Sequence, residues 1–256
     1  LDILTIEIMD LKKIKPQFIK KPNPRIGLIA LASDFMIEKD FVNIIKDKNI
    51  DFFVNRIKCY NPLTSENLIK MSKDVTDVTS DILPDEKIDC VVYGCTSGTI
   101  AAGHDSIERK IKLAKPEAKV ITPSTAAITA LKKLNIKKIS VFTPYPKKLN
   151  DEVVAFFKNE KFEIISNSYF DIESDIDIGK VDPDYLYDVL INMDHKDADA
   201  LFVSCTALPV LSIIDRLEKK INKFVLSSNQ ALIWDTLKKI GKNNSINGFG
   251  KLFSSN

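Results

Sequence analysis

The sequence has little of what marks several protein classes. Only four of its 256 residues are cysteine and two are histidine, too few for a disulfide framework and without the spacing of a zinc site. Neither charge dominates, since 37 lysines and arginines stand against 35 aspartates and glutamates. Phosphate binding needs a concentrated excess of basic charge. We therefore expect no nucleic-acid partner and no metal.

Long apolar runs are also absent. No apolar stretch approaches the roughly 20 residues that span a bilayer, and the first residues, LDILTIEIMDLKKIKP, lack the basic region and cleavage site of a signal peptide. We expect a cytoplasmic protein with no membrane partner. Hydrophobic residues make up 45% of the chain, ample for the core of one large domain or two small ones.

Short apolar runs rich in valine, isoleucine and phenylalanine alternate with helical patterns along the chain. Continuous apolar strands joined by helices are typical of parallel sheets covered on both faces, so the pattern predicts an α/β fold. The predicted strands are residues 25–31, 50–57, 88–95, 119–124, 137–144, 162–170, 199–206 and 223–228. Between the first four strands, helical spacing covers residues 38–48, 65–83 and 98–114.

The second group of strands repeats the first. Cys205 lies 110 residues after Cys95, each closes an apolar strand, and each is followed by threonine. The segment 227–240 likewise resembles 122–134 at a similar offset. All α/β proteins look self-similar at this level, but the shared Cys-Thr favours duplication. We expect two pseudo-symmetric three-layer α/β/α halves, each with a four-stranded, mainly parallel sheet, and an active site in the cleft between them.

The duplication also sets the expected domain boundaries. We expect the first half to span residues 25–134 and the second half residues 135–240. Residues 1–24 are then an N-terminal extension. The tail, residues 241–256, contains glycine and aromatic residues, and we expect it to pack back on the first half.

Two cysteines stand where a strand ends and a helix begins, Cys95 in VVYGCTSGT and Cys205 in LFVSCTALP. Ligands of parallel sheets gather at such strand ends, where free N–H groups of the next helix attract negative charge. A thiol there is expected to have a pKa below its usual value, beside a cradle for a carboxylate. One strand-end cysteine more often only packs, but two equivalent ones predict a reacting pair.

The remaining cysteines and histidines have simpler interpretations. Cys90 lies in the middle of a predicted strand and reads as core, and Cys59 reads as a filler at a strand end. His104 falls beyond the Cys95 turn and His195 lies in a polar segment, so both are expected to be solvated or capping residues.

A set of motifs resembles a known family. GCTSGT, TPSTAA, FTPY, SCTALP and SSNQALIWDTL are similar to the aspartate/glutamate racemase superfamily, in the branch with maleate cis–trans isomerase, arylmalonate decarboxylase and the ectoine-utilisation protein A. The resemblance covers residues 25–252 and implies an enzyme that works without a cofactor.

The resemblance implies a role for each cysteine. Cys95 would serve one face of the substrate and Cys205 the other, as acid and base in a racemase. In an isomerase Cys95 would instead add covalently to a double bond. Arylmalonate decarboxylase has a single cysteine, at the position of Cys205, so the presence of both favours racemase or isomerase chemistry. Tyr145 of FTPY matches a tyrosine that hydrogen-bonds the bound carboxylate.

Two positions depart from this branch. Maleate isomerases carry asparagines where this chain has Asp34 and Asp175. An ionised aspartate only accepts hydrogen bonds and repels a carboxylate, which favours a substrate with a cationic or hydroxylated end, such as an amino acid, unless Asp34 simply caps the next helix. The predicted substrate-binding residues are Ser33, Asp34, Thr96, Ser97, Thr122, Tyr145, Asp175, Thr206 and Ala207.

Three functions compete at this point. The leading hypothesis is a cofactor-independent isomerase or racemase acting on a small carboxylic or amino acid. The second is a decarboxylase in which Cys205 protonates an enediolate after loss of carbon dioxide. The third is a non-catalytic two-lobed protein that binds small acids. GCTSGT lacks the spacing of a nucleotide loop, and the resemblance also allows a homodimer.

Overall fold

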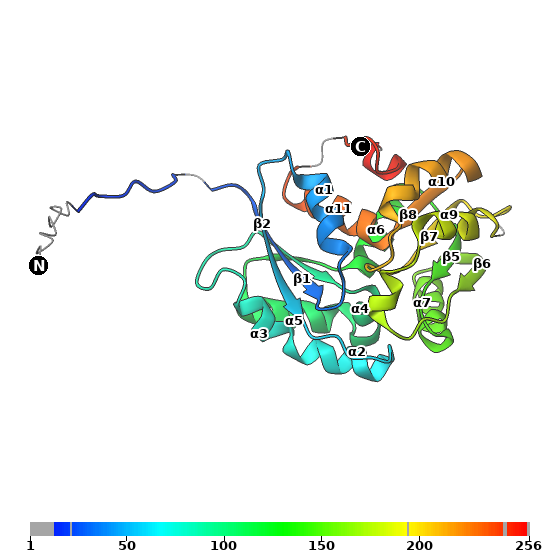
Figure 1. The fold of residues 1–256 in the computed structure, drawn as a ribbon, viewed down its shortest axis with the longest axis horizontal. Helices are drawn as coiled ribbons and strands as arrows, with labels where there is room; N and C mark the ends of the chain where they lie inside the picture. The colour runs from blue at the N-terminus through cyan, green and yellow to red at the C-terminus, as the bar shows by residue number, and fades with distance from the viewer. Residues whose placement is uncertain (1–12, 21, 194, 243–244, 255–256) are drawn as a thin grey trace, which may run out of the picture.

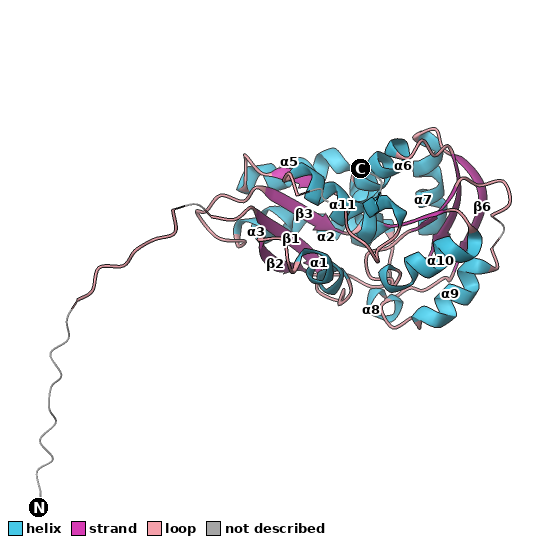
Figure 2. Ribbon diagram, turned by 90° about the horizontal axis from the view of Figure 1, so that it is seen from above, coloured by secondary structure: helices cyan, strands magenta, loops and turns pink. Residues whose placement is uncertain are grey.

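The computed structural model describes residues 13–20, 22–193, 195–242 and 245–254. It confirms the predicted fold class, because two four-stranded sheets lie among helices (Figures 1 and 2). The strand orders are β2-β1-β3-β4 and β6-β5-β7-β8, and every pairing is parallel. The second sheet therefore repeats the topology of the first, as a duplication predicts.

All eight predicted strands are present. They are β1 (Arg25–Leu31), β2 (Asp51–Ile57), β3 (Cys90–Gly94), β4 (Lys119–Ile121), β5 (Lys138–Thr143), β6 (Glu163–Tyr169), β7 (Ala200–Val203) and β8 (Phe224–Ser227). The inner strands β1, β3, β5 and β7 are almost completely buried. This burial on both faces explains why their sequences are apolar without alternation.

Helices cover the sheets and connect their strands. They are α1 (Ile37–Ile45), α2 (Ser65–Met71), α3 (Val75–Ser80), α4 (Thr96–Ala102), α5 (His104–Ala114), α6 (Pro123–Lys133), α7 (Lys147–Asn159), α8 (Asp175–Ile178), α9 (Pro183–Ile191), α10 (Ile214–Ile221) and α11 (Ser228–Lys239), with 3₁₀ turns η1 (Ser72–Asp74), η2 (Leu211–Ile213) and η3 (Lys251–Ser254). Two predicted helices are divided. The segment 98–114 breaks at Gly103, whose φ of 81° suits glycine best, and 65–83 breaks at η1.

The two halves are joined by shared helices. α11 follows β8 of the second sheet, yet it contacts β3 and β4 of the first sheet as well as α1 and α6. α4 of the first half in turn contacts α7 of the second. The buried apolar residues of both sheets consequently form one continuous core.

The C-terminal tail differs from the expectation. Its described residues contact the second half, because Asp215 accepts a hydrogen bond from the Gly250 N–H and Glu218 accepts one from the Lys251 N–H. Gln230 of α11 also donates to the Phe249 carbonyl oxygen. Two acidic groups on α10 thus bind the backbone of the tail, a pairing that the composition of the tail alone does not reveal. Of the described helices, none is long and apolar enough to cross a membrane.

Candidate active site

The two predicted reacting cysteines lie at equivalent places in the two sheets. Cys95 directly follows β3 and caps α4, and Cys205 follows β7 by two residues. Both side chains are buried, with exposed fractions of 3% and 4%. Cys205 has a φ of 109°, a backbone conformation that is strained for a residue with a side chain. Strain of this kind is frequent at functional sites.

Hydrogen bonds join the turns that carry the two cysteines. The Thr206 hydroxyl donates to the Gly94 carbonyl oxygen at 3.1 Å. On the other side, Ser228 bridges the turns: it accepts from the Thr96 hydroxyl at 2.8 Å and from the Cys205 N–H at 3.0 Å. Thr206 therefore contacts the turn of Cys95 directly, and Thr96 is linked to the turn of Cys205 through Ser228. Thr96 and Thr206, two of the predicted substrate-binding residues, thus lie between the two cysteine turns.

Each thiol accepts a hydrogen bond from a backbone amide in its own turn. The Gly98 N–H donates to Cys95 Sγ at 3.2 Å, and the Ala207 N–H donates to the Cys205 thiol. Ser97 Oγ lies 3.9 Å from Cys95 Sγ. A Cβ atom on residue 98 would come within 2.8 Å of the sulfur, so only glycine lets this amide approach. These contacts favour the thiolate of each cysteine.

The prediction that each thiol has a lowered pKa is nevertheless wrong for this structure, in which both thiols are buried. Burial raises the pKa of both Cys95 and Cys205, because a thiolate loses its hydration there. The Asp175 carboxylate raises the pKa of both thiols further. The amide hydrogen bonds act in the opposite direction but do not outweigh burial and charge. The helix start alone predicted the wrong sign because it says nothing about desolvation.

Tyr145 lies against both thiols. Its side chain is 2% exposed, hydrogen-bonds Cys205, and interacts electrostatically with Cys95 as well. Burial and the two thiols hold the pKa of its hydroxyl well above the usual range, so the group keeps its proton. The structure therefore places a neutral hydrogen-bond donor where the resemblance predicted a carboxylate ligand.

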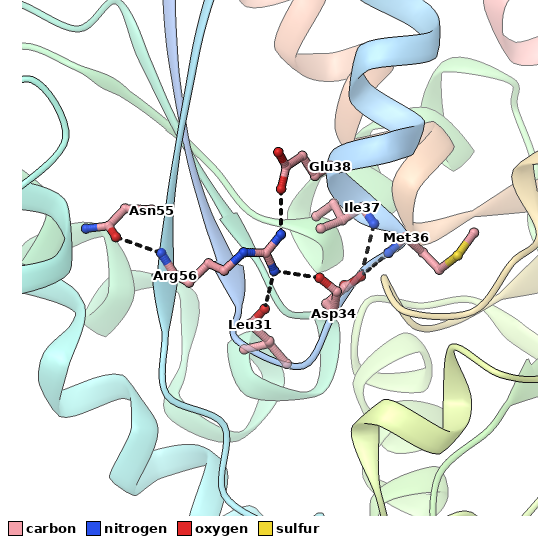
Figure 3. Close-up of polar contacts among 7 residues, drawn as sticks. All are labelled: Leu31, Asp34, Met36, Ile37, Glu38, Asn55 and Arg56. Atoms are coloured by element: carbon pink, nitrogen blue, oxygen red, sulfur yellow. Dashed lines mark hydrogen bonds and ion pairs between the residues drawn. The ribbon is translucent and has the colours of Figure 1, made fainter.

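The loop between β1 and α1 brings Ser33 and Asp34 to the same place. Asp34 Oδ1 accepts hydrogen bonds from the N–H groups of Met36 and Ile37 at the start of α1 (Figure 3). The helix-capping alternative thus accounts for one oxygen of this carboxylate. Its other oxygen, Oδ2, is buried and has no hydrogen-bond partner among the described residues. Capping leaves that second oxygen unexplained.

Asp175 reaches this region from the second half of the chain. The Ser33 hydroxyl donates to Asp175 Oδ2 at 2.5 Å, and the Asp175 N–H donates to Asn61 Oδ1 at 3.2 Å. The Leu63 N–H also donates to the Glu173 carbonyl oxygen at 2.8 Å. The segment that carries these residues, 171–182, is called the crossing segment because it belongs to the second half and contacts the first.

Thr122, one of the predicted substrate-binding residues, makes its side-chain contacts, within the described part of the chain, with α5 and α6 and not with the cysteine turns. The hydroxyl of Thr122, at the N-terminus of α6, contacts His104 Nδ1 at 3.1 Å and the Thr125 hydroxyl at 2.8 Å. His104, Asp105 and Glu108 form the one described group with side-chain ligand atoms close enough for a metal, within 4.8 Å of one another. These partly exposed side chains belong to α5, and exposed acidic groups commonly lie together without an ion.

Two further side chains, which the sequence patterns did not single out for the site, lie near the thiols. Cys59, interpreted as a filler, interacts with Ser33 and with Asp175, and burial raises its pKa to about 11. The Tyr93 hydroxyl is completely buried beside Cys95 and has no hydrogen-bond partner among the described residues. The sequence contained a signal for each. Tyr93 lies two residues before Cys95, and side chains two residues apart on a strand share a face. Cys59 follows β2, and β2 pairs with β1, which leads to Ser33.

Comparison with known proteins gives a consistent result. The family profile described as arylmalonate decarboxylase matches residues 99–253. Maleate isomerase of Geobacillus stearothermophilus is 25% identical over 245 residues, which cover 90% of this chain and 97% of that protein. The match to maleate isomerase covers nearly the whole of both chains, whereas the decarboxylase profile covers residues 99–253. This difference in coverage supports the isomerase prediction over the decarboxylase alternative.

Solved structures share the whole fold. The maleate isomerase Iso from Pseudomonas putida S16 superposes with a TM-score of 0.84 at 25% identity, covering 90% of this chain and 98% of that one. Nocardia farcinica maleate cis–trans isomerase, solved as a mutant with a covalently bound succinylcysteine intermediate, gives a TM-score of 0.84 at 19% identity, over 91% and 99% of the two chains.

Two parallel α/β units with a cysteine at the equivalent strand end of each define a duplicated α/β class of enzyme folds, in agreement with the resemblance to the aspartate/glutamate racemase superfamily. Within this class, the chain belongs to the arylmalonate decarboxylase family.

Proposed function

We propose that this chain is a cofactor-independent isomerase or racemase that acts on a small carboxylic or amino acid through Cys95 and Cys205. One observation carries the proposal: the two thiols come from equivalent strand ends, lie in turns that are hydrogen-bonded to each other, and share contact with Tyr145. Two groups that each take or give a proton are what chemistry at both faces of one carbon needs.

In a racemase route, the thiolate of one cysteine removes the proton from the carbon next to the substrate carboxylate. The electron pair of that C–H bond moves into the carboxylate and gives an enediolate. The thiol of the other cysteine then delivers its proton to the opposite face, and the substrate leaves inverted. The neutral Tyr145 hydroxyl is placed to donate a hydrogen bond to the enediolate oxygen, where negative charge develops.

In an isomerase route, the thiolate of Cys95 forms a bond to one alkene carbon, and the alkene electron pair moves to the other carbon. That carbon takes a proton from the Cys205 thiol, and the former double bond rotates. Cys205 then removes a proton, the double bond re-forms, and the sulfur–carbon bond breaks to release the Cys95 thiolate. The Nocardia relative, with its succinylcysteine intermediate, supports this route for the fold.

Both routes need the site to open, because the sulfur atoms are almost completely covered. The crossing segment lies beside the thiols and contacts the first half through Asp175 on Ser33 and Glu173 on Leu63. Entry of substrate therefore requires that segment to separate from the first half, and closure removes water from the reacting atoms.

The experiment is a screen of small acids with the full chain in D₂O, followed by NMR, to detect inversion with deuterium uptake or cis–trans conversion. With the reactive acid identified, Cys95→Ser and Cys205→Ser should each lower kcat/KM by about a thousandfold or more. Cys90→Ala, in the middle of the first sheet, is the matched control and should retain activity. Full activity in either serine variant contradicts the proposal, and decarboxylation that survives Cys95→Ser supports the decarboxylase alternative.

A further inference from the structure

Two aspartates, one from each half, are buried beside the thiols. Asp34 comes from the loop after β1 and has no exposed surface, and Asp175 begins α8 with an exposed fraction of 3%. Ser33 links them, since it precedes Asp34 in the chain and its hydroxyl donates to Asp175. Both carboxylates act electrostatically on Cys205. They therefore line the same space as the reacting sulfur.

Within the described part of the chain neither aspartate forms an ion pair, and the only cation whose charge acts on either of them is Arg56, on Asp34. Among the described residues, no lysine or arginine forms an ion pair with Asp34 or Asp175. The nearest guanidinium, that of Arg56, donates instead to the main-chain carbonyl oxygens of Leu31 and Asp34 and to the Glu38 carboxylate (Figure 3). The charge of Arg56 is thus largely engaged outside the pair.

Asp34 also has an unsatisfied acceptor. Its Oδ1 is engaged with the start of α1, but Oδ2 is buried without a hydrogen-bond partner among the described residues. The Thr206 hydroxyl lies beside this carboxylate, yet it donates to the Gly94 carbonyl oxygen. An orphaned buried acceptor costs about 1–3 kcal/mol, and such groups in native proteins usually indicate a missing partner.

The two buried carboxylates disfavour the thiolate that the proposed reaction needs. Burial raises the pKa of Asp175 to about 6, and the charge of Asp34 acts in the same direction. The same two carboxylates raise the pKa of Cys205 and so disfavour its thiolate. A positive group between them reverses each effect, because it balances both carboxylates, supplies a donor to Asp34 Oδ2 and lowers the pKa of the nearby thiols.

We propose that Asp34 and Asp175 together bind a cationic nitrogen of the substrate, so that the substrate is a small acid with an ammonium or similar group and not a plain dicarboxylic acid. The proposal rests on the proposed function for one step only, the placement of the reacting carbon at the thiols. Tyr145, which hydrogen-bonds Cys205, is then the donor for the carboxylate end. A dicarboxylate would meet two buried negative charges.

The test compares ligands that differ only in charge. Binding to the full chain is measured by calorimetry and thermal shift at about pH 8. At about this pH both aspartates are ionised once the site opens to water. The ligands are amino acids of three to five carbons and the dicarboxylic acids of the same length. We expect at least one amino acid to bind about tenfold or more tightly than its dicarboxylic counterpart. Stronger binding of the dicarboxylic acids, or no binding of any amino acid, overturns the proposal.

Variants of the two aspartates test whether these residues cause the preference for the amino acid. Asp34→Asn and Asp175→Asn keep the shape of each side chain, and the amide introduced by Asp34→Asn retains an oxygen for the start of α1. Each should weaken the amino acid about tenfold and strengthen the dicarboxylic acid. Asp40→Asn, an equally buried carboxylate that hydrogen-bonds Asn229, is the matched control and should leave the preference unchanged. Equal effects in all three variants contradict a specific cation site.

The outcome is separable from that of the proposed function. Binding of the cationic acid should persist in Cys95→Ser, which removes the reaction but neither aspartate. If the two cysteines are essential and the substrate carries only carboxylates, the cation site fails and the two-cysteine function stands. If an amino acid binds at the aspartates but turnover survives loss of both thiols, the function fails and the cation site stands.

Discussion

At the scale of single residues, Tyr145 shows how burial sets a chemical role. The hydroxyl is enclosed with Ser204 and Cys205, and burial holds its pKa well above the ordinary value. A tyrosine in that state keeps its proton near neutral pH and can donate a hydrogen bond. The proposed function gives this hydroxyl the role of stabilising negative charge on the substrate as a hydrogen-bond donor.

Tyr145→Phe tests this role. Removal of the hydroxyl should lower kcat/KM by about 10- to 100-fold, the usual consequence of losing one donor to a developing negative charge, while the melting temperature changes by only a few degrees. Steady-state kinetics with the identified substrate measures the effect. Tyr169→Phe, at an exposed position in β6, should be neutral, and a similar loss in both variants contradicts the assignment.

Much of the site could be predicted from residues alone. Cys95, Cys205, Thr96 and Thr206 followed from the strand ends and the duplication, and the structure brings them together. The contacts of Cys59 with Ser33 and Asp175 could not be predicted, because these neighbours come from distant parts of the chain. The sign of the thiol pKa was wrong for the same reason, since desolvation depends on packing that no local motif encodes.

At the scale of elements, the contact between α1 and α11 contains a buried carboxylate. Asn229 of α11 donates from Nδ2 to Asp40 Oδ2 of α1 at 2.8 Å and to the Thr206 carbonyl oxygen at 2.7 Å. Burial raises the pKa of Asp40 from 3.8 to about 7, although the Asn229 hydrogen bond opposes this. The carboxyl is thus readily protonated in the folded protein near neutral pH.

This shift predicts how stability depends on pH. The folded protein holds the Asp40 proton up to about pH 7, but the unfolded chain releases it near 3.8. The contribution of Asp40 is therefore fully present below 3.8 and is lost as the pH rises to and through 7, which lowers the free energy of unfolding by up to about 4 kcal/mol. In Asp40→Asn this loss should be absent. Urea unfolding at several pH values measures it, and an identical pH dependence in variant and wild type contradicts the shift.

The elements themselves were predicted more accurately than their ends and partners. All eight strands followed from apolar runs, but the break between α4 and α5 depends on the φ of Gly103, which the helical spacing around it conceals. The placement of α11 on the first sheet could not be predicted either. That helix is buried on nearly every face, so its sequence does not specify which sheet it covers.

At the scale of the whole molecule, the site exists only where the two halves meet. Cys95, Asp34 and Ser33 belong to the first half, and Cys205, Tyr145 and Asp175 belong to the second. The crossing segment contacts the first half through Asp175 and Glu173, and a Cβ atom on Gly179 would lie 2.7 Å from the Phe35 ring, so a larger residue would push the segment away. Movement of the crossing segment away from the first half is therefore the expected route for substrate.

The most direct test of this account is a chemical bridge between the two sulfur atoms. Native full-length protein is treated with 1,3-dichloroacetone, which links two thiols through three carbons, and its peptides are mapped by mass spectrometry. The account predicts one dominant cross-link, between Cys95 and Cys205, formed while Cys90 in the core stays unmodified. Separate single labels on the two cysteines, or bridges that leave either of them out, would contradict a shared site.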